Sequence, residues 1–376
     1  MSTVREEKGG VKSSKRRPTS PRQVEGRRNV LIHRIENDVH AASIAYALEQ
    51  RGNRVFQWHT GRYPEDAAVS IAYEGGSYIA TFRNRELKFS PSDIDVVWFR
   101  RRQLPVAPQT IDARDRAFVT NELRVATQAH NAFFNHAFWI NRFETADFCD
   151  LKPRQFLLAQ ERGLSIPITL ISNDPDDIKE FLGRTRKCIY KPLIGHVWNE
   201  AGRLRKTYTS FISHKQLPAD DLLRAAPGIF QKFVDKAYEA RVQFFGNFYA
   251  GVRIDSSKLE EGHLDWRIGQ SAIGACKPVT LPPDVYTKCR QLMNDLGIVS
   301  GGFDFIINKK DEWIFLEVNE AGQFFFVEGW CQELPVVDAF CQFIESKDEN
   351  FVYRPPRRRL TLKEAYLAAK KAGIVP

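Results

Sequence analysis

The pattern of apolar and polar positions predicts a β-α-β unit after an unpatterned start. Residues 1–28 show no apolar periodicity, which is typical of a disordered tail. The apolar runs at 29–33 and 54–58 have strand character. Between them we expect a helix that Asp38 caps and that ends at Gly52.

The same lobe continues with a predicted hairpin and a third strand. Gly75 and Gly76 separate two alternating runs in the manner of a hairpin turn, and 95–99 is another strand-like run. These elements predict a small α/β lobe over about 29–108. A long helical pattern follows at roughly 112–131.

The second half alternates short strands with a few helices. From Asp150 a helix is predicted that Gly163 stops. The strand-like runs, separated by Gly, Pro, Asp and Asn, lie at 168–172, 187–191, 207–212, 228–234, 240–246, 248–254, 301–307 and 312–318, with helical patterns at 284–297, 335–345 and 360–373. The partner of the last helix stays open. The fold class predicted is a mixed α/β (α+β) protein with two or three lobes.

The net charge of the chain does not by itself indicate a nucleic-acid-binding protein, because the excess of basic residues lies at the two ends of the chain. The 376 residues carry 55 Lys and Arg against 46 Asp and Glu, a net charge of +9. Residues 1–28 account for +6 and residues 346–376 for +5, so the body between them is net −2. Charge runs at termini are usually solvated tails, so we do not expect a nucleic-acid-binding face. A protein that binds nucleic acid through these tails stays a remote alternative.

Targeting and cofactor signals are few. No apolar stretch follows the basic N-terminal segment, and none approaches the roughly 18 residues of a membrane span, so we expect a soluble, cytoplasmic protein. The six cysteines show no paired spacing, which predicts reduced and mostly buried thiols. Zinc-site, P-loop, dinucleotide-binding and nucleophile-elbow motifs are absent from the sequence.

An oxygen-rich group of side chains lies on the last predicted hairpin. Period 2 places Glu317 and Asn319 on one face of a strand, and Asp304 on the preceding strand would face them. Two carboxylates and an amide oxygen on rigid strands suit Mg²⁺. The alternative is that these are ordinary solvent-facing positions. The flanking residues are almost all apolar, which favours buried strands and therefore a compensating metal.

Four basic residues could serve phosphates. Lys152 begins a predicted helix, Lys191 closes a strand, and Arg241 and Arg253 lie on consecutive strands. Any one of them alone is more often a surface ion-pair residue than a ligand. Their order along the chain, before the Asp304 hairpin, is the informative feature.

This arrangement resembles the ATP-grasp ligases, and more narrowly the microviridin-type maturases, which build graspetides by linking side chains of a precursor peptide. The resemblance covers about 29–345. Its departures are Glu320-Ala321, where the family usually has Pro after the metal-binding Asn, and the extension past 346. The segments that carry it are VLIHRIENDVHAASIAYALEQRG, HTGRYP, DVVWFRRRQLP, LKPRQFLLAQERGLSIPITLISND, IYKPLIGH, APGIFQKFVDKAYEARVQFFGNFYAGVRID, LDWRIG and GGFDFIINKKDEWIFLEVNEAGQF.

The resemblance implies an ATP-grasp fold with an N-terminal pre-ATP-grasp domain. The divisions predicted are a disordered basic tail (1–28), the pre-ATP-grasp domain (29–149), a central ATP-grasp subdomain (150–230), a C-terminal ATP-grasp subdomain (231–345) and a basic extension with a short helix (346–376).

The resemblance also implies roles for individual residues. Those that match ATP-binding positions are Lys152 and Lys191 for the phosphates, Gln231, Lys232, Phe233 and Val234 for adenine, and Glu239 for the ribose. Asp304, Glu317 and Asn319 match the Mg²⁺ ligands, and Arg241 and Arg253 match catalytic arginines that neutralise the transferring phosphoryl group and the acyl intermediate. Arg267 is a less certain phosphate or substrate contact. Arg100 and Arg101 could meet an acidic peptide, or could form a salt-bridged surface run.

The implied reaction starts from the poor reactivity of a carboxylate. Phosphorylation by ATP converts the carboxylate to an acyl phosphate, which an amine or hydroxyl then attacks. The enzyme promotes these steps mainly by positioning the reacting groups and neutralising their charge. In the family both groups belong to side chains of one precursor peptide, which has a leader and an acidic core, and the products are ω-esters or ω-amides.

Residues 194–208 are the candidate lid, with a simple exposed connection as the alternative. A ligase that adds an amino acid to a small molecule or protein tail is the second hypothesis. The bond type and the oligomeric state, a homodimer included, stay open.

Overall fold

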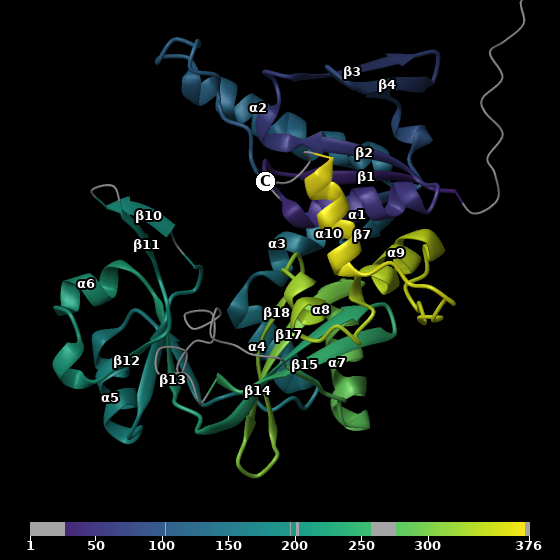
Figure 1. The fold of residues 1–376 in the computed structure, drawn as a ribbon. Coiled ribbons are helices and arrows are strands. Elements are labelled where there is room, and N and C mark those ends of the chain that lie inside the picture. The colour runs from purple at the N-terminus through teal and green to yellow at the C-terminus, as the bar shows by residue number, and fades with distance from the viewer. Residues whose placement is uncertain (1–26, 102, 196, 201–202, 257–275, 373–376) are drawn as a thin grey trace, which may run out of the picture.

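The computed structural model describes residues 27–101, 103–195, 197–200, 203–256 and 276–372. The elements form three groups (Figure 1). The N-terminal elements lie at the top, a small lobe lies at the left, and a larger lobe built on a five-stranded sheet lies below. The mixed α/β class predicted from the sequence is confirmed.

The N-terminal lobe is a parallel sheet with a smaller antiparallel sheet above it. Its main sheet has the strand order β2-β1-β6-β7, and all its pairs are parallel. Asp38 accepts hydrogen bonds from the backbone N–H groups of His40 and Ala41, as predicted for the cap of α1. The elements are β1 (Asn29–Arg34), α1 (Val39–Gln50), β2 (Arg54–His59), β3 (Ala67–Glu74), β4 (Ser77–Asn84), β5 (Lys88–Phe89), β6 (Val96–Phe99), α2 (Arg116–Asn131), β7 (Phe138–Ile140) and α3 (Phe143–Cys149).

The small lobe is an antiparallel sheet of order β12-β9-β13-β8 covered by two helices. A separate hairpin of β10 and β11 extends from it toward the N-terminal lobe (Figure 1). The elements are β8 (Thr169–Ser172), α5 (Pro175–Arg184), β9 (Cys188–Lys191), β10 (Val197–Glu200), β11 (Arg203–Lys206), β12 (Ser210–Ile212), α6 (Asp220–Ala225) and β13 (Gly228–Lys232).

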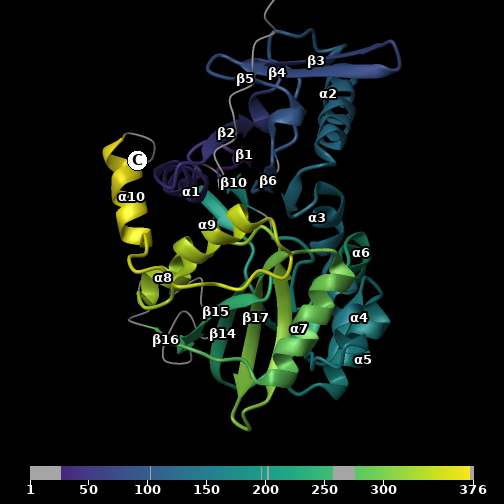
Figure 2. The ribbon, with the colours of Figure 1, turned by 90° about the vertical axis from the view of Figure 1, so that its right-hand side faces the viewer.

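The larger lobe is built on the antiparallel sheet β16-β15-β14-β17-β18. Its apolar face packs against α4 and α7, where Phe303, Phe305 and Phe315 are fully buried (Figure 2). The elements are α4 (Lys152–Glu161), β14 (Lys236–Phe245), β15 (Phe248–Ile254), β16 (Lys277–Pro278), α7 (Pro283–Leu296), β17 (Ser300–Asn308), β18 (Trp313–Asn319), α8 (Phe325–Trp330) and α9 (Val336–Ser346).

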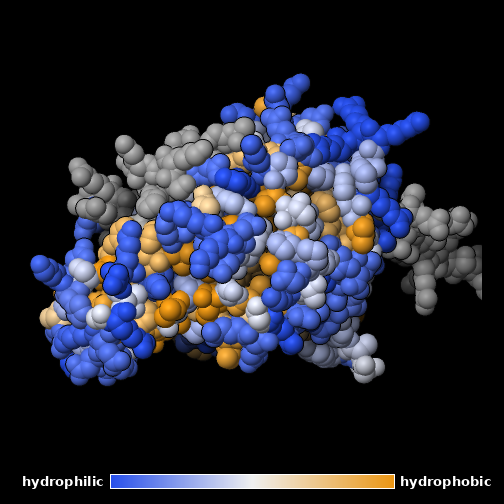
Figure 3. Space-filling view, turned by 90° about the horizontal axis from the view of Figure 1, so that it is seen from below, coloured by the Kyte–Doolittle hydropathy of each residue, from blue (hydrophilic) through white to orange (hydrophobic). Residues whose placement is uncertain are grey.

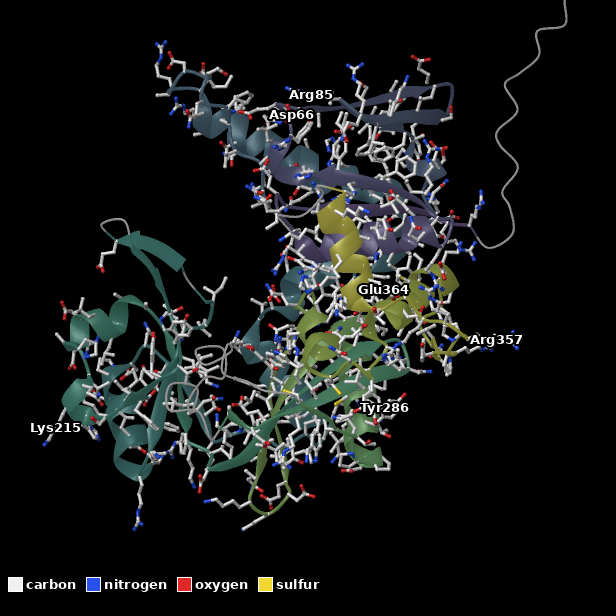
Figure 4. All side chains as sticks on the ribbon, viewed as in Figure 1. Asp66, Arg85, Lys215, Tyr286, Arg357 and Glu364 are labelled. Carbon is white, nitrogen blue, oxygen red and sulfur yellow. The ribbon has the colours of Figure 1, made fainter. Side chains whose placement is uncertain are left out.

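The C-terminal helix α10 (Leu362–Lys371) packs on α1, the partner that the sequence left open (Figures 1 and 2). Ala365 and Ala369 are fully buried in this contact region. Thr361 and Glu364 form a capping box at its start, and Figure 4 shows Glu364 at that end of the helix. The described part of the C-terminal extension is therefore attached to the body and is not a solvated tail.

The cysteines agree with the sequence prediction. None of the six forms a disulfide bond, and five of them are buried. Among the described helices, none combines the length and the apolar character needed to cross a membrane. The domain limits given above stay a prediction.

Candidate active site

One row of charged side chains crosses three strands of the larger sheet. Arg241 on β14 pairs directly with Asp304 on β17, and Asp304 pairs with Glu317 on β18. Directly paired residues of antiparallel strands share a face, so the three side chains project to the same side of the sheet. Just beyond Asp304 the register with β18 shifts by one residue. Asp304 pairs with Glu317 but Phe305 pairs with Phe315, so Leu316 is the extra residue on β18.

The predicted metal ligands Asp304, Glu317 and Asn319, which we call the oxygen cluster, are linked through Asn319, which lies within hydrogen-bond distance of both carboxylates. Asn319 Nδ2 lies 3.1 Å from Asp304 Oδ2 and 3.4 Å from Glu317 Oε1. Lys152 Nζ, at the start of α4, lies 3.0 Å from Glu317 Oε2. The cluster therefore joins two carboxylates and one amide, and a lysine reaches it from a neighbouring helix.

Arg241 is held in one position at the edge of this cluster. Its side chain is 5% exposed, and Nη1 lies 2.8 Å from Asp304 Oδ2. Nη2 donates to the carbonyl of Gln323 at 3.3 Å. A Cβ atom on Gly302 or on Gly322 would overlap this guanidinium, so both positions need the small residue.

A cleft between the two lobes contains the other predicted nucleotide residues. The space between the atoms that line it is about 410 Å³, open solvent included. Ile306 and Leu316, on the same strands as the oxygen cluster, line it as well. Figure 3 shows the molecule from below, where hydrophobic residues gather in the middle between hydrophilic ones. The predicted residues in its lining are Lys191, Gln231, Lys232, Phe233, Val234 and Glu239.

The polar groups that line this cleft form hydrogen bonds or an ion pair with other groups of the protein. Gln231 is buried and donates from Nε2 to Thr169 Oγ1 at 2.9 Å. Glu239 Oε1 is 2.6 Å from Lys236 Nζ and accepts a hydrogen bond from Ser256 at 2.5 Å. The N–H of Phe233 donates to the carbonyl of Lys187. These bonds fix the shape of the cleft wall.

Arg253 does not join the row that contains Arg241. It pairs with Ala240, the residue before Arg241, and so it projects to the opposite face of the sheet. There its Nε lies 2.7 Å from Asp255, and its guanidinium lies 4.1 Å from the centre of the Tyr238 ring. Two residues on consecutive strands need not share a face. The sequence alone therefore did not reveal that these two arginines project to opposite sides of the sheet. Arg267 lies outside the described residues.

Arg100 lies in the interior of the protein and not in a surface run, and its contact with a peptide stays a prediction. It is 2% exposed, and its Nη1 donates to the carbonyl of Ala321 at 2.6 Å. Its Nε lies 3.7 Å from the Asp38 carboxylate. Arg101 is half-buried, and its N–H donates to the carbonyl of His33.

Sequence reasoning missed the buried amides that support the site. Gln155 on α4 binds both backbone groups of Val318, accepting at 2.9 Å and donating at 2.8 Å. Asn141 accepts from Val299 N–H and donates to the carbonyls of Ser300 and Glu320. Asn141 lies outside the segments that carry the resemblance, and Gln155 lies in one of them without an assigned role. Only the fold shows that each one binds the backbone beside the oxygen cluster.

Residues 29–147 match a family model described as the MvdD pre-ATP grasp domain. A search of curated proteins found no match. Among solved structures, a RiPP-associated ATP-grasp ligase of Chryseobacterium gregarium, in complex with ADP and a leader and core peptide, has a TM-score of 0.78 and 25% identity. The match covers 85% of this chain and 97% of that one.

Two further structures have the same fold. The macrocyclase MdnC of Microcystis aeruginosa MRC, bound with the precursor peptide MdnA, has a TM-score of 0.72 and 24% identity, with 85% of this chain and 99% of that chain covered. The macrocyclase MdnB of the same organism has a TM-score of 0.72 and 24% identity, with 84% and 99% covered. The chain therefore has the fold of the ATP-grasp ligases. Within that fold, residues 29–147 match the MvdD-type pre-ATP-grasp domain.

Proposed function

We propose that this chain is an ATP- and Mg²⁺-dependent ligase that activates Asp or Glu side chains of a ribosomal precursor peptide as acyl phosphates. A Thr, Ser or Lys side chain of the same peptide then closes an ω-ester or ω-amide ring. The observation that carries the proposal is the row of Arg241, Asp304 and Glu317 beside the cleft between the lobes. The solved relatives support it, because one is described with ADP and a leader and core peptide and another with its precursor peptide.

The oxygen cluster fits Mg²⁺ by its chemistry. The described residues contain no group of three or more His, Cys, Asp or Glu side chains that could hold a metal, so a metal here would rely on the two carboxylates, the Asn319 amide and nucleotide phosphates. That is the incomplete, all-oxygen donor set that Mg²⁺ uses at phosphate sites. Bound there, Mg²⁺ would neutralise charge on the phosphates of the nucleotide.

The remaining residues take the roles expected of their positions. Lys152 is within reach of Glu317 and is our candidate for the phosphates, together with Lys191 in the cleft wall. Gln231 to Val234 and Glu239 line the cleft where we place adenine and ribose. Arg241, fixed between Asp304 and the Gln323 carbonyl, would face the transferring phosphoryl group without reorganising. Arg253 has no such support from its position.

Exclusion of water is the other requirement of an acyl phosphate. The hairpin of β10 and β11 lies within the predicted lid, 194–208, and extends from the small lobe toward the N-terminal lobe (Figure 1). A precursor made on the ribosome would meet the enzyme in the cytoplasm, which is where we place it.

The test uses short peptides encoded beside the gene that contain repeated Thr, Ser or Lys and Asp or Glu residues. Each is incubated with the full chain, ATP and Mg²⁺, and analysed by mass spectrometry. We expect one ADP for each bond and a loss of one water per bond. Glu317→Gln keeps the shape of the side chain but removes its charge, and it should stop both while the fold is retained.

Two results would contradict the proposal. ATP turnover with no loss of water from any such peptide would exclude ring closure. A gain of mass that matches an added amino acid would instead support the amino-acid-adding ligase.

A further inference from the structure

The segment Asn319–Phe325, which we call the 319–325 loop, joins the oxygen cluster to α8. It begins with the cluster residue Asn319 and contains Ala321 and Gly322, so its own sequence restrains its backbone weakly. Side chains from distant parts of the chain bind its backbone groups instead. These contacts come from two directions, and Arg241 supplies one of them through the carbonyl of Gln323.

The other contacts come from one edge of the N-terminal parallel sheet. Arg100, just after β6, donates to the carbonyl of Ala321 at 2.6 Å. Asn141, just after β7, donates to the carbonyl of Glu320 at 3.2 Å. His40, in the first turn of α1, accepts at 3.3 Å from the N–H groups of both Phe324 and Phe325. The carboxyl ends of parallel strands are where α/β sheets usually bind ligands, and here that edge binds the loop.

Two of these side chains are in states that suit this task. Burial lowers the pKa of His40 to about 2, with Arg100 and Arg101 adding to the effect, so its ring is neutral and can accept hydrogen bonds. Burial lowers the pKa of Arg100 to about 10, which still leaves it charged at neutral pH. A charge buried to 2% exposure is costly unless it is paired and hydrogen-bonded, and Asp38 and the Ala321 carbonyl provide those partners.

We propose that Arg100, His40 and Asn141 are positioning residues for the oxygen cluster. They fix the 319–325 loop from the N-terminal lobe, and through it the placement of Asn319 and Arg241. The N-terminal lobe thereby sets the affinity of the cluster for a divalent cation. This inference rests on the proposed function, because it assumes that the cluster binds a metal with a nucleotide.

The experiment measures metal binding directly. Mn²⁺ replaces Mg²⁺ and is titrated into the full chain saturated with ADP, and the free Mn²⁺ is followed by electron paramagnetic resonance. Arg100→Met keeps an unbranched side chain but removes the donor to Ala321. We expect about 10-fold weaker Mn²⁺ binding, as for outer residues that orient metal ligands. Arg100→Lys, which retains one donor, should recover part of the affinity.

Arg51 provides the matched control. It lies in the same lobe and also crosses to the C-terminal part, where its guanidinium binds Asp338 at 2.9 Å and Glu345 at 2.7 Å on α9. Neither partner belongs to the 319–325 loop. Arg51→Met should therefore reduce thermal stability and leave Mn²⁺ affinity unchanged.

The possible results distinguish failure of this inference from failure of the proposed function on which it rests. Wild-type Mn²⁺ affinity in folded Arg100→Met would overturn it, as would an equal loss of affinity in Arg51→Met, which would indicate general docking of the lobes. If Arg100→Met does not fold, His40→Leu removes the acceptor of two loop amides from a half-buried position, and unchanged affinity there would also overturn it. Failure of the wild type to bind Mn²⁺ with ADP would instead contradict the proposed function.

Discussion

The segments at the two ends of strand β18 are held in place by different kinds of contact. At its start, the turn 308–312 is closed by its own residues, because Asn308 Oδ1 accepts from the N–H groups of Lys310 and Glu312. At its end, the 319–325 loop is held by Arg100, His40 and Asn141 from another lobe. The first end is exposed and carries no proposed chemistry. The second adjoins the oxygen cluster, so precise placement there depends on residues far away in the sequence.

The largest expected effect concerns Arg241, which joins the loop end to Asp304. Arg241→Lys keeps the charge but cannot bind Asp304 and the Gln323 carbonyl with a planar fork. We expect peptide-dependent ATP turnover to fall roughly 1,000-fold, the upper range for loss of one preorganised donor. Arg253→Lys, on the opposite face, should lose far less. Equal losses measured by steady-state kinetics would show that the two faces do not differ in function.

A smaller effect is expected from the neighbouring glycines of β17. Gly302→Ala places a methyl group against the Arg241 guanidinium and should lower turnover about 100-fold by misplacing it. Gly301→Ala places its methyl group 2.9 Å from Val318 Cγ2 on the other face. It should cost roughly 1–3 kcal/mol in the free energy of unfolding by overpacking, with turnover per folded molecule preserved. Denaturant unfolding and kinetics on both variants check the contrast, and a loss of turnover only in Gly301→Ala would reverse our assignment of the faces.

The smallest effect belongs to the self-contained turn. Asn308→Ala removes three hydrogen bonds in an exposed turn and should lower the free energy of unfolding by about 1 kcal/mol. Because this end of β18 is remote from the oxygen cluster, Mn²⁺ affinity in the presence of ADP should not change. A weaker Mn²⁺ affinity would mean that the turn, like the loop, positions the cluster.

The same contrast explains what the sequence could predict. The last hairpin, with strands predicted at 301–307 and 312–318, and the cap of α1 by Asp38 depend on neighbouring residues, and both were predicted correctly. The common face of Asp304, Glu317 and Asn319 also followed from local period 2 and a hairpin. Metal binding by these residues stays a prediction.

Features that depend on distant pairing could not be predicted in this way. The register of β14 with β15 decides that Arg241 and Arg253 face opposite sides, and no local pattern contains that register. The buried position of Arg100 depends on Asp38 and Ala321, which only the fold brings to it. Likewise, α10 was recognised as a helix, but its packing on α1 joins the two ends of the chain.

The central claim is that the loop end of β18 binds a nucleotide together with a divalent cation. Calorimetric titration of ADP into the full chain, with Mg²⁺ or with a chelator, tests it most directly when wild type and Glu317→Gln are compared. The account predicts that Mg²⁺ tightens ADP binding to the wild type and has no such effect on Glu317→Gln. The same ADP affinity with and without Mg²⁺ in the wild type would contradict it.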